Sequence, residues 1–198
     1  MKILELFSGT GEFSKIAKEQ GHIVYTIDNN PKCNPDKCID ILKLKIKDIP
    51  FKPDFIWASP PCTDYSHAKR TGTSFIELSN MLVIKTISLI LALKPKYWVI
   101  ENPQTGTLKF QYFITELPYM DIDYCRYGRT FRKRTRLWNN FDFQGLLCNC
   151  IGKHEDSCGN GRVEYTKNKL NAYQKGSIPK ELTLEILKQI KQKGSDNQ

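Results

Sequence analysis

Short apolar runs separated by turn-forming residues occur along most of the chain, and they predict alternating strands and helices. Strands are expected at residues 2–7, 23–27, 54–59, 97–100, 119–127 and 135–138. Apolar residues at helical spacing instead predict helices at 13–17, 75–93 and 182–190. Gly21 and Pro95 follow the first two helices, in the positions where such residues end helices.

Strands that alternate with helices predict an α/β fold of the Rossmann-like kind, with a mostly parallel sheet and helices on both faces. Residues 1–138 are expected to form the main domain, and residues 139–177 a short insert that contains Cys and His. Residues 178–198 are expected to form a helix that packs back on the main domain and ends in a frayed tail.

The chain has 198 residues, of which 40% are hydrophobic, and this composition is sufficient for one packed domain. No apolar stretch is expected to span a bilayer, because the best candidate, residues 87–93, is bracketed by Lys85 and Lys94. No signal-peptide pattern opens the chain. These features predict a soluble, intracellular protein with no membrane partner.

The formal net charge is +9, which suits either a polyanionic partner or simple solubility. The distribution of charge favours the first interpretation, because residues 126–136 contain six cations and no acid. These cations are Arg126, Arg129, Arg132, Lys133, Arg134 and Arg136. Aromatic residues interleave with them, so the cluster predicts contact with nucleic-acid phosphates.

A glycine-containing loop follows the first predicted strand and opens the first predicted helix. In a Rossmann-like sheet this loop holds a nucleotide-containing cofactor. Gly9 and Gly11 allow close approach of a ligand, but Ser14 occupies the position of the third glycine of the dinucleotide pattern. Asp28 ends the next strand and could bind ribose hydroxyls, while Asp40 could either meet an adenine amino group or cap a turn. S-adenosylmethionine and NAD are both compatible with this pattern.

Two prolines and a cysteine follow the strand at residues 54–59. Pro60 and Pro61 stiffen the loop, so Cys62 is expected to be held rigidly at the edge of the sheet where chemistry gathers. A buried, unreactive thiol is the alternative, although the residues after Cys62 are polar. Glu101 ends the neighbouring strand and would lie beside the thiol.

Four motifs occur in an order that resembles the cytosine-5 DNA methyltransferases. They are residues 6–11, 60–62, 101–102 and 134–136. The resemblance covers residues 2–138, and the chain as a whole is similar to short methyltransferase-like proteins of phages and large DNA viruses. It implies an S-adenosylmethionine-dependent methyltransferase fold and transfer of a methyl group to C5 of cytosine.

The resemblance also implies a role for individual residues. Cys62 would attack C6 of the base, Glu101 would hydrogen-bond or protonate N3, and Arg134 and Arg136 would hold the base and favour the thiolate. S-adenosylmethionine would contact Phe7, Ser8, Gly9, Thr10, Gly11, Asp28, Asn29, Asp40, Ile41 and Pro60. The substrate would contact Pro61, Ser66, Asn102 and Arg132.

The implied partner is double-stranded DNA from which the target cytosine is flipped out, and the protein is expected to be a monomer. Three alternatives remain: cytosine-5 methylation of RNA, methylation of an exocyclic amino group of adenine or cytosine in DNA, and an inactive relative that binds nucleic acid. The family usually carries a separate target-recognition domain, whereas here only residues 139–177 follow the last motif.

Cysteines and a histidine gather in this short region. Cys148, Cys150, His154 and Cys158 are zinc-type ligands, although their spacing matches no common zinc finger. Two interpretations stay open: a small loop held by structural zinc, or a polar loop with incidental cysteines. The seven cysteines are an odd number, which argues against a disulfide framework.

Overall fold

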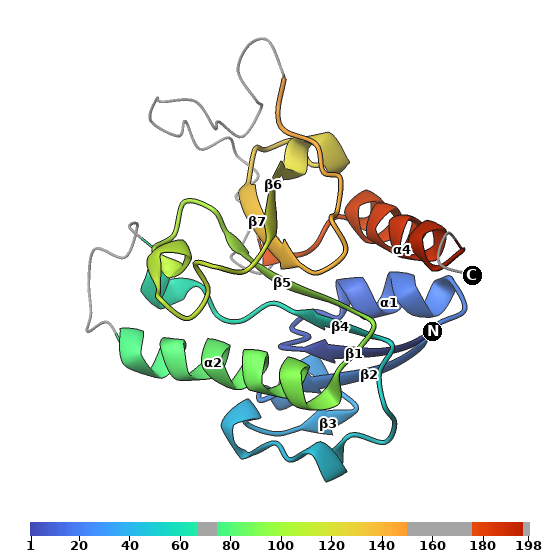
Figure 1. Cartoon of the computed structure of the whole chain (residues 1–198), viewed down its shortest axis with the longest axis vertical. Helices are drawn as coiled ribbons and strands as arrows, with labels where there is room; N and C mark the ends of the chain where they lie inside the picture. Colours follow the sequence, from blue (N-terminus) through green and yellow to red (C-terminus); the bar gives the residue numbers. More distant parts are fainter. Residues whose placement is uncertain (67–74, 150–175, 196–198) are drawn as a thin grey trace.

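The computed structural model describes residues 1–66, 75–149 and 176–195 and contains a seven-stranded sheet flanked by helices (Figure 1). The strands are β1 (Lys2–Leu6), β2 (Ile23–Asp28), β3 (Lys37–Cys38), β4 (Phe55–Ala58), β5 (Tyr97–Pro103), β6 (Tyr119–Asp123) and β7 (Arg134–Asn139). The α-helices are α1 (Glu12–Glu19), α2 (Ile76–Leu93) and α4 (Lys180–Ser195). The 3₁₀ turns are η1 (Pro31–Cys33), η2 (Ile41–Lys43), η3 (Ile46–Asp48), η4 (Thr63–Tyr65), η5 (Leu108–Phe110) and η6 (Tyr124–Tyr127).

The order of the strands across the sheet is β3-β2-β1-β4-β5-β7-β6. The first five strands in this order pair in parallel, whereas β7 runs antiparallel to both β5 and β6. The prediction of a mostly parallel α/β sheet is therefore confirmed. Parallel pairing brings the carboxyl ends of β1, β2, β3, β4 and β5 to one edge of the sheet, where ligands bind in open α/β folds.

Alternating strand residues feed two hydrophobic cores, one on each face of the sheet. One face packs against α1 and α4, with Phe13 stacked on Trp57 at a ring separation of 4.6 Å. The other face packs against α2 through buried side chains that include Val83 and Leu89. Figure 1 shows α1 and α4 together on one side of the sheet and α2 on the other. Helices therefore cover both faces, as predicted.

Helix α2 is more apolar than the sequence interpretation allowed. By length and composition its 18 residues, with a mean hydropathy of 1.8, could cross a membrane, so the expectation that no stretch approaches this length is wrong. In the folded chain Val83, Leu89, Ile90 and Leu93 are buried in the core on the α2 face of the sheet. The charges at positions 85 and 94 therefore did not limit the apolar helix, which begins well before the run at residues 87–93.

A buried carboxyl group lies between β1 and α1. Glu5 is only 3% exposed, and its Oε2 atom has no hydrogen-bond partner among the described residues. Burial raises the pKa of Glu5 to about 8, although hydrogen bonds with Ser14 partly oppose this shift. Glu5 is therefore a neutral acid in the folded protein at neutral pH, directly beneath the helix that follows the glycine loop.

The raised pKa of Glu5 predicts a fall in stability as pH rises. Between the ordinary pKa of about 4.5 and the folded pKa of about 8, the unfolded chain releases a proton that the folded chain retains. The free energy of unfolding should fall over this window by up to about 1.4 kcal/mol per pH unit. The Glu5→Gln variant should lack this component and be more stable than the parent at pH 8, as measured by urea unfolding at several pH values. Glu19→Gln, at an exposed position of α1, is the control. If plots of unfolding free energy against pH run parallel for the parent and Glu5→Gln, the assignment of the raised pKa to Glu5 is contradicted.

Candidate active site

The loop after β1 is built around two glycines with left-handed backbone. Gly9 has a φ of 50° and Gly11 a φ of 69°, a conformation that residues with a Cβ rarely adopt. The Gly11 N–H donates to the Ser8 carbonyl, and Gly11 then forms the N-cap of α1. The Gly9 N–H donates to the Asp28 carboxylate over 2.9 Å. The loop is therefore held tightly against the end of β2.

A cavity of about 290 Å³ lies between this loop and the ends of β2, β3 and β4. Its lining residues are Phe7, Gly9, Ile27, Asp28, Asn29, Asn30, Cys33, Ile39, Asp40, Ile41, Ser59, Pro61 and Leu82. It combines an apolar wall with two carboxylates. Both carboxylates also support the local backbone, because Asp28 accepts from the Asn30 N–H and Asp40 caps η2 through the Leu42 N–H. The two interpretations of Asp40, as a ligand group and as a cap, are thus compatible in one geometry.

Most of the expected cofactor residues meet at this cavity, but four do not line it. Ser8 and Gly11 form the backbone hydrogen bond that closes the loop, and Thr10 is exposed to solvent. Pro60 is buried, and its neighbour Pro61 faces the cavity instead. The sequence interpretation missed Cys33, Ile39, Ser59 and Leu82, which come from turns and from the distant helix α2.

Cys62 lies on a short arm beyond the end of β4. The buried amide of Asn102, on β5, donates to the Pro60 carbonyl over 2.9 Å and ties this arm to the neighbouring strand. After Cys62 the chain turns into η4, closed by a hydrogen bond from the Tyr65 N–H to the Cys62 carbonyl. Cys62 itself reaches the surface. The arm therefore presents a thiol in a fixed position next to the cavity lined by Pro61.

Glu101 lies next to this arm, buried near the end of β5. Its Oε1 atom accepts from the Tyr124 hydroxyl at 3.1 Å and from the Lys133 ammonium at 3.2 Å. The Lys133 side chain is 19% exposed and also lies over the Tyr124 ring, 4.6 Å from its centre. Within the described residues both hydrogen bonds fall on Oε1, so Oε2 can meet a ligand. The sequence interpretation named neither Tyr124 nor Lys133 as a partner of Glu101.

The surroundings of Cys62 favour the neutral thiol. Although Cys62 as a residue is exposed, partial desolvation of its thiol raises the pKa of Cys62, and the charge of Glu101 raises it further, whereas the charge of Lys133 lowers it. The expectation that Arg134 and Arg136 favour the thiolate is therefore not met by this geometry. The cation that acts on the thiol is Lys133.

The structure places the two arginines of the Arg-x-Arg motif elsewhere. Arg136 forms a bidentate ion pair with Asp121, with distances of 2.7 and 2.8 Å, and lies 3.5 Å above the Tyr119 ring. Arg134 is 3.8 Å from Asp123 and its side chain is 42% exposed. Antiparallel pairing of β6 and β7 sets these acids opposite the arginines. In the described structure both arginines thus form ion pairs within the protein, and their contact with the base stays a prediction.

The remaining arginines of the cluster also have partners within the protein. Arg126 and Arg129 donate to the neutral side chains of Asn149 and Ser177, whereas Arg132 forms an ion pair with Asp123. The acid lies outside the 126–136 window, so a count of charges within that window does not find it. Contact of the cluster with phosphates remains a prediction, and the exposed guanidinium of Arg134 is its best candidate.

The structure places the four expected substrate residues in different surroundings. Pro61 lines the cavity, and Ser66 is exposed just after η4. Asn102 is fully buried and serves the backbone of the Cys62 arm, whereas Arg132 is held by Asp123 on β6. Contact of Asn102 or Arg132 with a substrate stays a prediction.

The proposed zinc ligands fall largely outside the described residues. Cys150, His154 and Cys158 lie outside the described residues. Cys148 is described, and its backbone N–H donates to the Asp123 carboxylate over 2.8 Å. Within residues 1–66, 75–149 and 176–195, no three His, Cys, Asp or Glu side chains form a group suited to a metal ion. Zinc therefore has no support from the described part of the chain.

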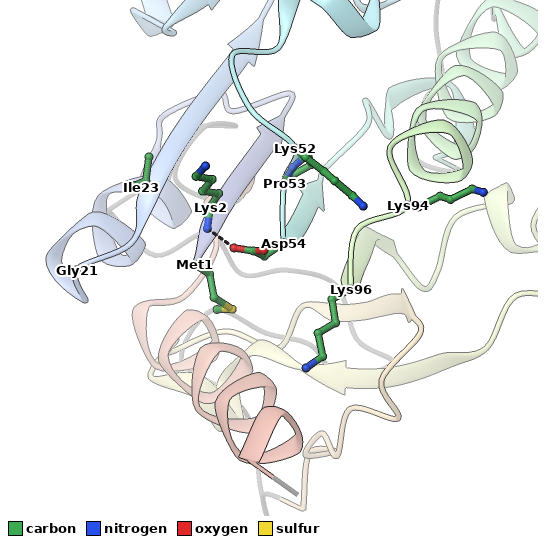
Figure 2. A pocket seen from close by; sticks show the side chains of 9 residues that line it. All are labelled: Met1, Lys2, Gly21, Ile23, Lys52, Pro53, Asp54, Lys94 and Lys96. Atoms are coloured by element: carbon green, nitrogen blue, oxygen red, sulfur yellow. Dashed lines mark hydrogen bonds between the residues drawn. The ribbon is translucent and has the colours of Figure 1, made fainter. Parts of the chain in front are cut away.

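A second cavity lies at the opposite ends of the strands and is larger, at about 690 Å³. Figure 2 shows its lining, which contains Asp54 and the four lysines Lys2, Lys52, Lys94 and Lys96. The Asp54 carboxylate accepts from the Lys2 backbone N–H over 2.7 Å. This cavity shares no lining residue with the smaller one, and Cys62 directly follows Pro61, which lines the smaller one.

Comparison with known sequences places this arrangement in a family. Residues 1–106 match the family described as C-5 cytosine-specific DNA methylase. A protein of Frog virus 3 (isolate Goorha), named "Probable DNA (cytosine-5)-methyltransferase", is 36% identical over 177 residues. That alignment covers 81% of this chain and 78% of the viral protein.

Solved structures agree on the fold at low sequence identity. A DNMT2 structure from Spodoptera frugiperda has a TM-score of 0.53 and 17% identity, and the match covers 74% of this chain and 54% of that one. A prophage-encoded protein of E. coli, provisionally named a DNA modification methyltransferase, has a TM-score of 0.56 and 13% identity. That match covers 96% of this chain and 69% of the other. The chain belongs to the C-5 cytosine-specific DNA methylase family.

Proposed function

We propose that this protein transfers a methyl group from S-adenosylmethionine to C5 of a cytosine in DNA, through a covalent adduct with Cys62. One observation carries the proposal. Cys62 lies on a fixed arm beside the cavity at the strand ends, and it is near enough to Glu101 for that carboxylate to raise the pKa of the thiol. A nucleophile and an acid at neighbouring strand ends are the groups that activation of C5 requires.

The lining of the smaller cavity fits S-adenosylmethionine better than NAD. The carboxylates of Asp28 and Asp40 suit the hydroxyl and amino groups of an adenosine, and the apolar wall suits its ring. Among the residues that line the cavity none is Lys or Arg, so a pyrophosphate would meet two carboxylates without a compensating cation. When bound, S-adenosylmethionine would supply an electrophilic methyl group.

Cys62 and Glu101 would divide the chemistry between them. The Cys62 sulfur would form a bond to C6 of the base, and the electron pair displaced from the ring would move toward N3. Glu101 would hydrogen-bond or protonate N3 through Oε2, so that C5 becomes nucleophilic and can accept the methyl group. Loss of the C5 proton to a base and elimination of the thiolate would then release the product.

Lys133 and Tyr124 would position Glu101 for this task. Both donate to Oε1, which fixes the carboxylate, and the Lys133 charge also favours the Cys62 thiolate. The cation of the active site in this proposal is thus Lys133, one residue before the Arg-x-Arg motif.

The proposed target is a cytosine extruded from duplex DNA. Attack on C6 occurs from the face of the ring, and that face is covered by neighbouring bases in a duplex. The net charge of +9 suits a polyanion of this kind.

Cofactor binding is the first test. Asp28→Ala should weaken S-adenosylmethionine binding at least about tenfold in calorimetry, because it removes a cavity carboxylate and releases the Gly9 loop. Asp36→Ala is the matched control, since Asp36 also binds β2, through Thr26, but does not line the cavity. Equal losses in both variants, or equally tight binding of NAD, would contradict the assignment of the cavity.

The covalent adduct is the second test. Duplex DNA that carries 5-fluorocytosine, incubated with tritiated S-adenosylmethionine, should trap a complex that survives denaturation, because fluorine blocks loss of the C5 proton. Cys62→Ser should abolish this complex. Cys38→Ser, which removes another exposed thiol, should leave it unchanged. Methyl transfer that persists in Cys62→Ser would refute the mechanism.

The role of Lys133 is the third test. Lys133→Met should reduce kcat about 10- to 100-fold and raise the pKa of Cys62, which slows alkylation of that residue by iodoacetamide at pH 8. Mass spectrometry of the Cys62 peptide measures the alkylation rate. Arg136→Met should lower stability, through loss of its ion pair with Asp121, without changing that rate. If Arg136→Met slows alkylation of Cys62 and Lys133→Met does not, Arg136 and not Lys133 is the residue that favours the thiolate.

A further inference from the structure

The chain between β5 and β6 exposes two aromatic rings next to a cation. Phe110 is 70% exposed and Tyr112 is 81% exposed. The Lys109 ammonium lies over the Phe110 ring, 5.1 Å from its centre. Lys109, Phe110 and Tyr112 are called the aromatic surface below. Side chains of this kind gain free energy from burial, so their shared exposure on one short segment indicates a surface that another molecule covers.

The aromatic surface is held by an ordered backbone. The Phe110 N–H donates to the Thr107 carbonyl in η5, and the flanking residues Leu108 and Ile114 are almost completely buried. The Tyr112 ring meets the edge of the Phe113 ring at 5.3 Å. The two exposed rings are therefore presented by a preformed turn, which lowers the entropy cost of binding a flat ligand.

This segment is joined to the Cys62 arm by two sets of hydrogen bonds. In the first set, the Thr107 N–H donates to the Tyr65 carbonyl over 2.9 Å, and the Tyr65 N–H donates to the Cys62 carbonyl over 3.1 Å. The close approach requires Gly106, because a Cβ there would lie 3.2 Å from the Tyr65 oxygen. In the second set, Asn80 accepts from the Tyr65 hydroxyl and donates to Gln111. The segment that carries the aromatic surface is thus hydrogen-bonded to the turn that directly follows Cys62.

We propose that the aromatic surface stacks on unpaired DNA bases next to the target cytosine. The inference rests on the proposed function, because extrusion of a base disrupts the pairing beside it and exposes base faces. Aromatic rings bind such faces with little dependence on sequence. Residues 104–117 contain one cation, Lys109, and one acid, Glu116, so stacking rather than net charge supplies the affinity of this segment.

The test measures binding and not activity. All variants are made in a Cys62→Ser background, and affinity for a fluorescein-labelled single-stranded DNA is measured by anisotropy at several salt concentrations. Phe110→Ala/Tyr112→Ala should weaken binding about 10- to 100-fold, by a similar factor at each salt concentration. The conservative variant Phe110→Tyr/Tyr112→Phe should bind like the parent, because both rings are kept.

The matched control is Leu91→Ala, which removes a side chain that is 68% exposed on α2. This variant should bind DNA like the parent. Parent-like binding by Phe110→Ala/Tyr112→Ala, an equal loss in Leu91→Ala, or a loss seen with RNA but not with DNA would each overturn the inference.

The outcome also separates this inference from the proposed function. If the wild-type protein forms no adduct with 5-fluorocytosine DNA but single-strand binding still depends on Phe110 and Tyr112, the binding surface stands and the methylation mechanism fails. If Phe110→Ala/Tyr112→Ala, made separately with Cys62 intact, forms the adduct normally, and its Cys62→Ser counterpart binds single-stranded DNA like the parent, the mechanism stands and the surface assignment fails.

Discussion

One buried hydrogen bond determines where the chemistry of this protein takes place. The side-chain amide of Asn102 donates to the Pro60 carbonyl and joins the carboxyl ends of β4 and β5. Pro60 and Pro61 restrict the backbone of the arm, and Asn102 fixes it to a neighbouring strand that is itself paired on both sides. Since Cys62 follows the arm and Glu101 precedes Asn102, this one contact sets the position of the thiol relative to the carboxylate.

The sheet and its edge could be predicted from the sequence because they depend on local pattern. Alternating apolar residues set which strand residues face each core. The loops after β1 and β4 carry Gly9 and Cys62, while Glu101 lies near the end of β5 itself. The same reasoning missed Leu82 as a lining residue of the cavity, because α2 reaches it only through tertiary packing. Local pattern thus defines the strand ends, whereas the shape of the cavity depends on elements far apart in the chain.

The partners of the basic residues could not be predicted for a related reason. A count of charges within residues 126–136 takes no account of acids on a neighbouring strand. The register of β6 and β7 sets Asp121 opposite Arg136 and Asp123 opposite Arg134. An ion pair that is bidentate and partly shielded from water is stronger than an exposed one, so Asp121 holds the guanidinium of Arg136 in place. Lys133, just before β7, has no acid opposite it in the hairpin and turns to Glu101 instead.

The charges around Cys62 link its reactivity to the presence of substrate. Desolvation and the nearby Glu101 carboxylate raise the pKa of the thiol, which favours its protonated form in the absence of substrate. A base that engages Glu101 through N3 would neutralise or redirect that negative charge, and Lys133 would then be the dominant charge acting on Cys62. The same change would lower the pKa of the thiol and bring its target within reach. In the proposed mechanism Glu101 would thus have two roles, as a partner of the base and as a charge that disfavours the thiolate until the base binds.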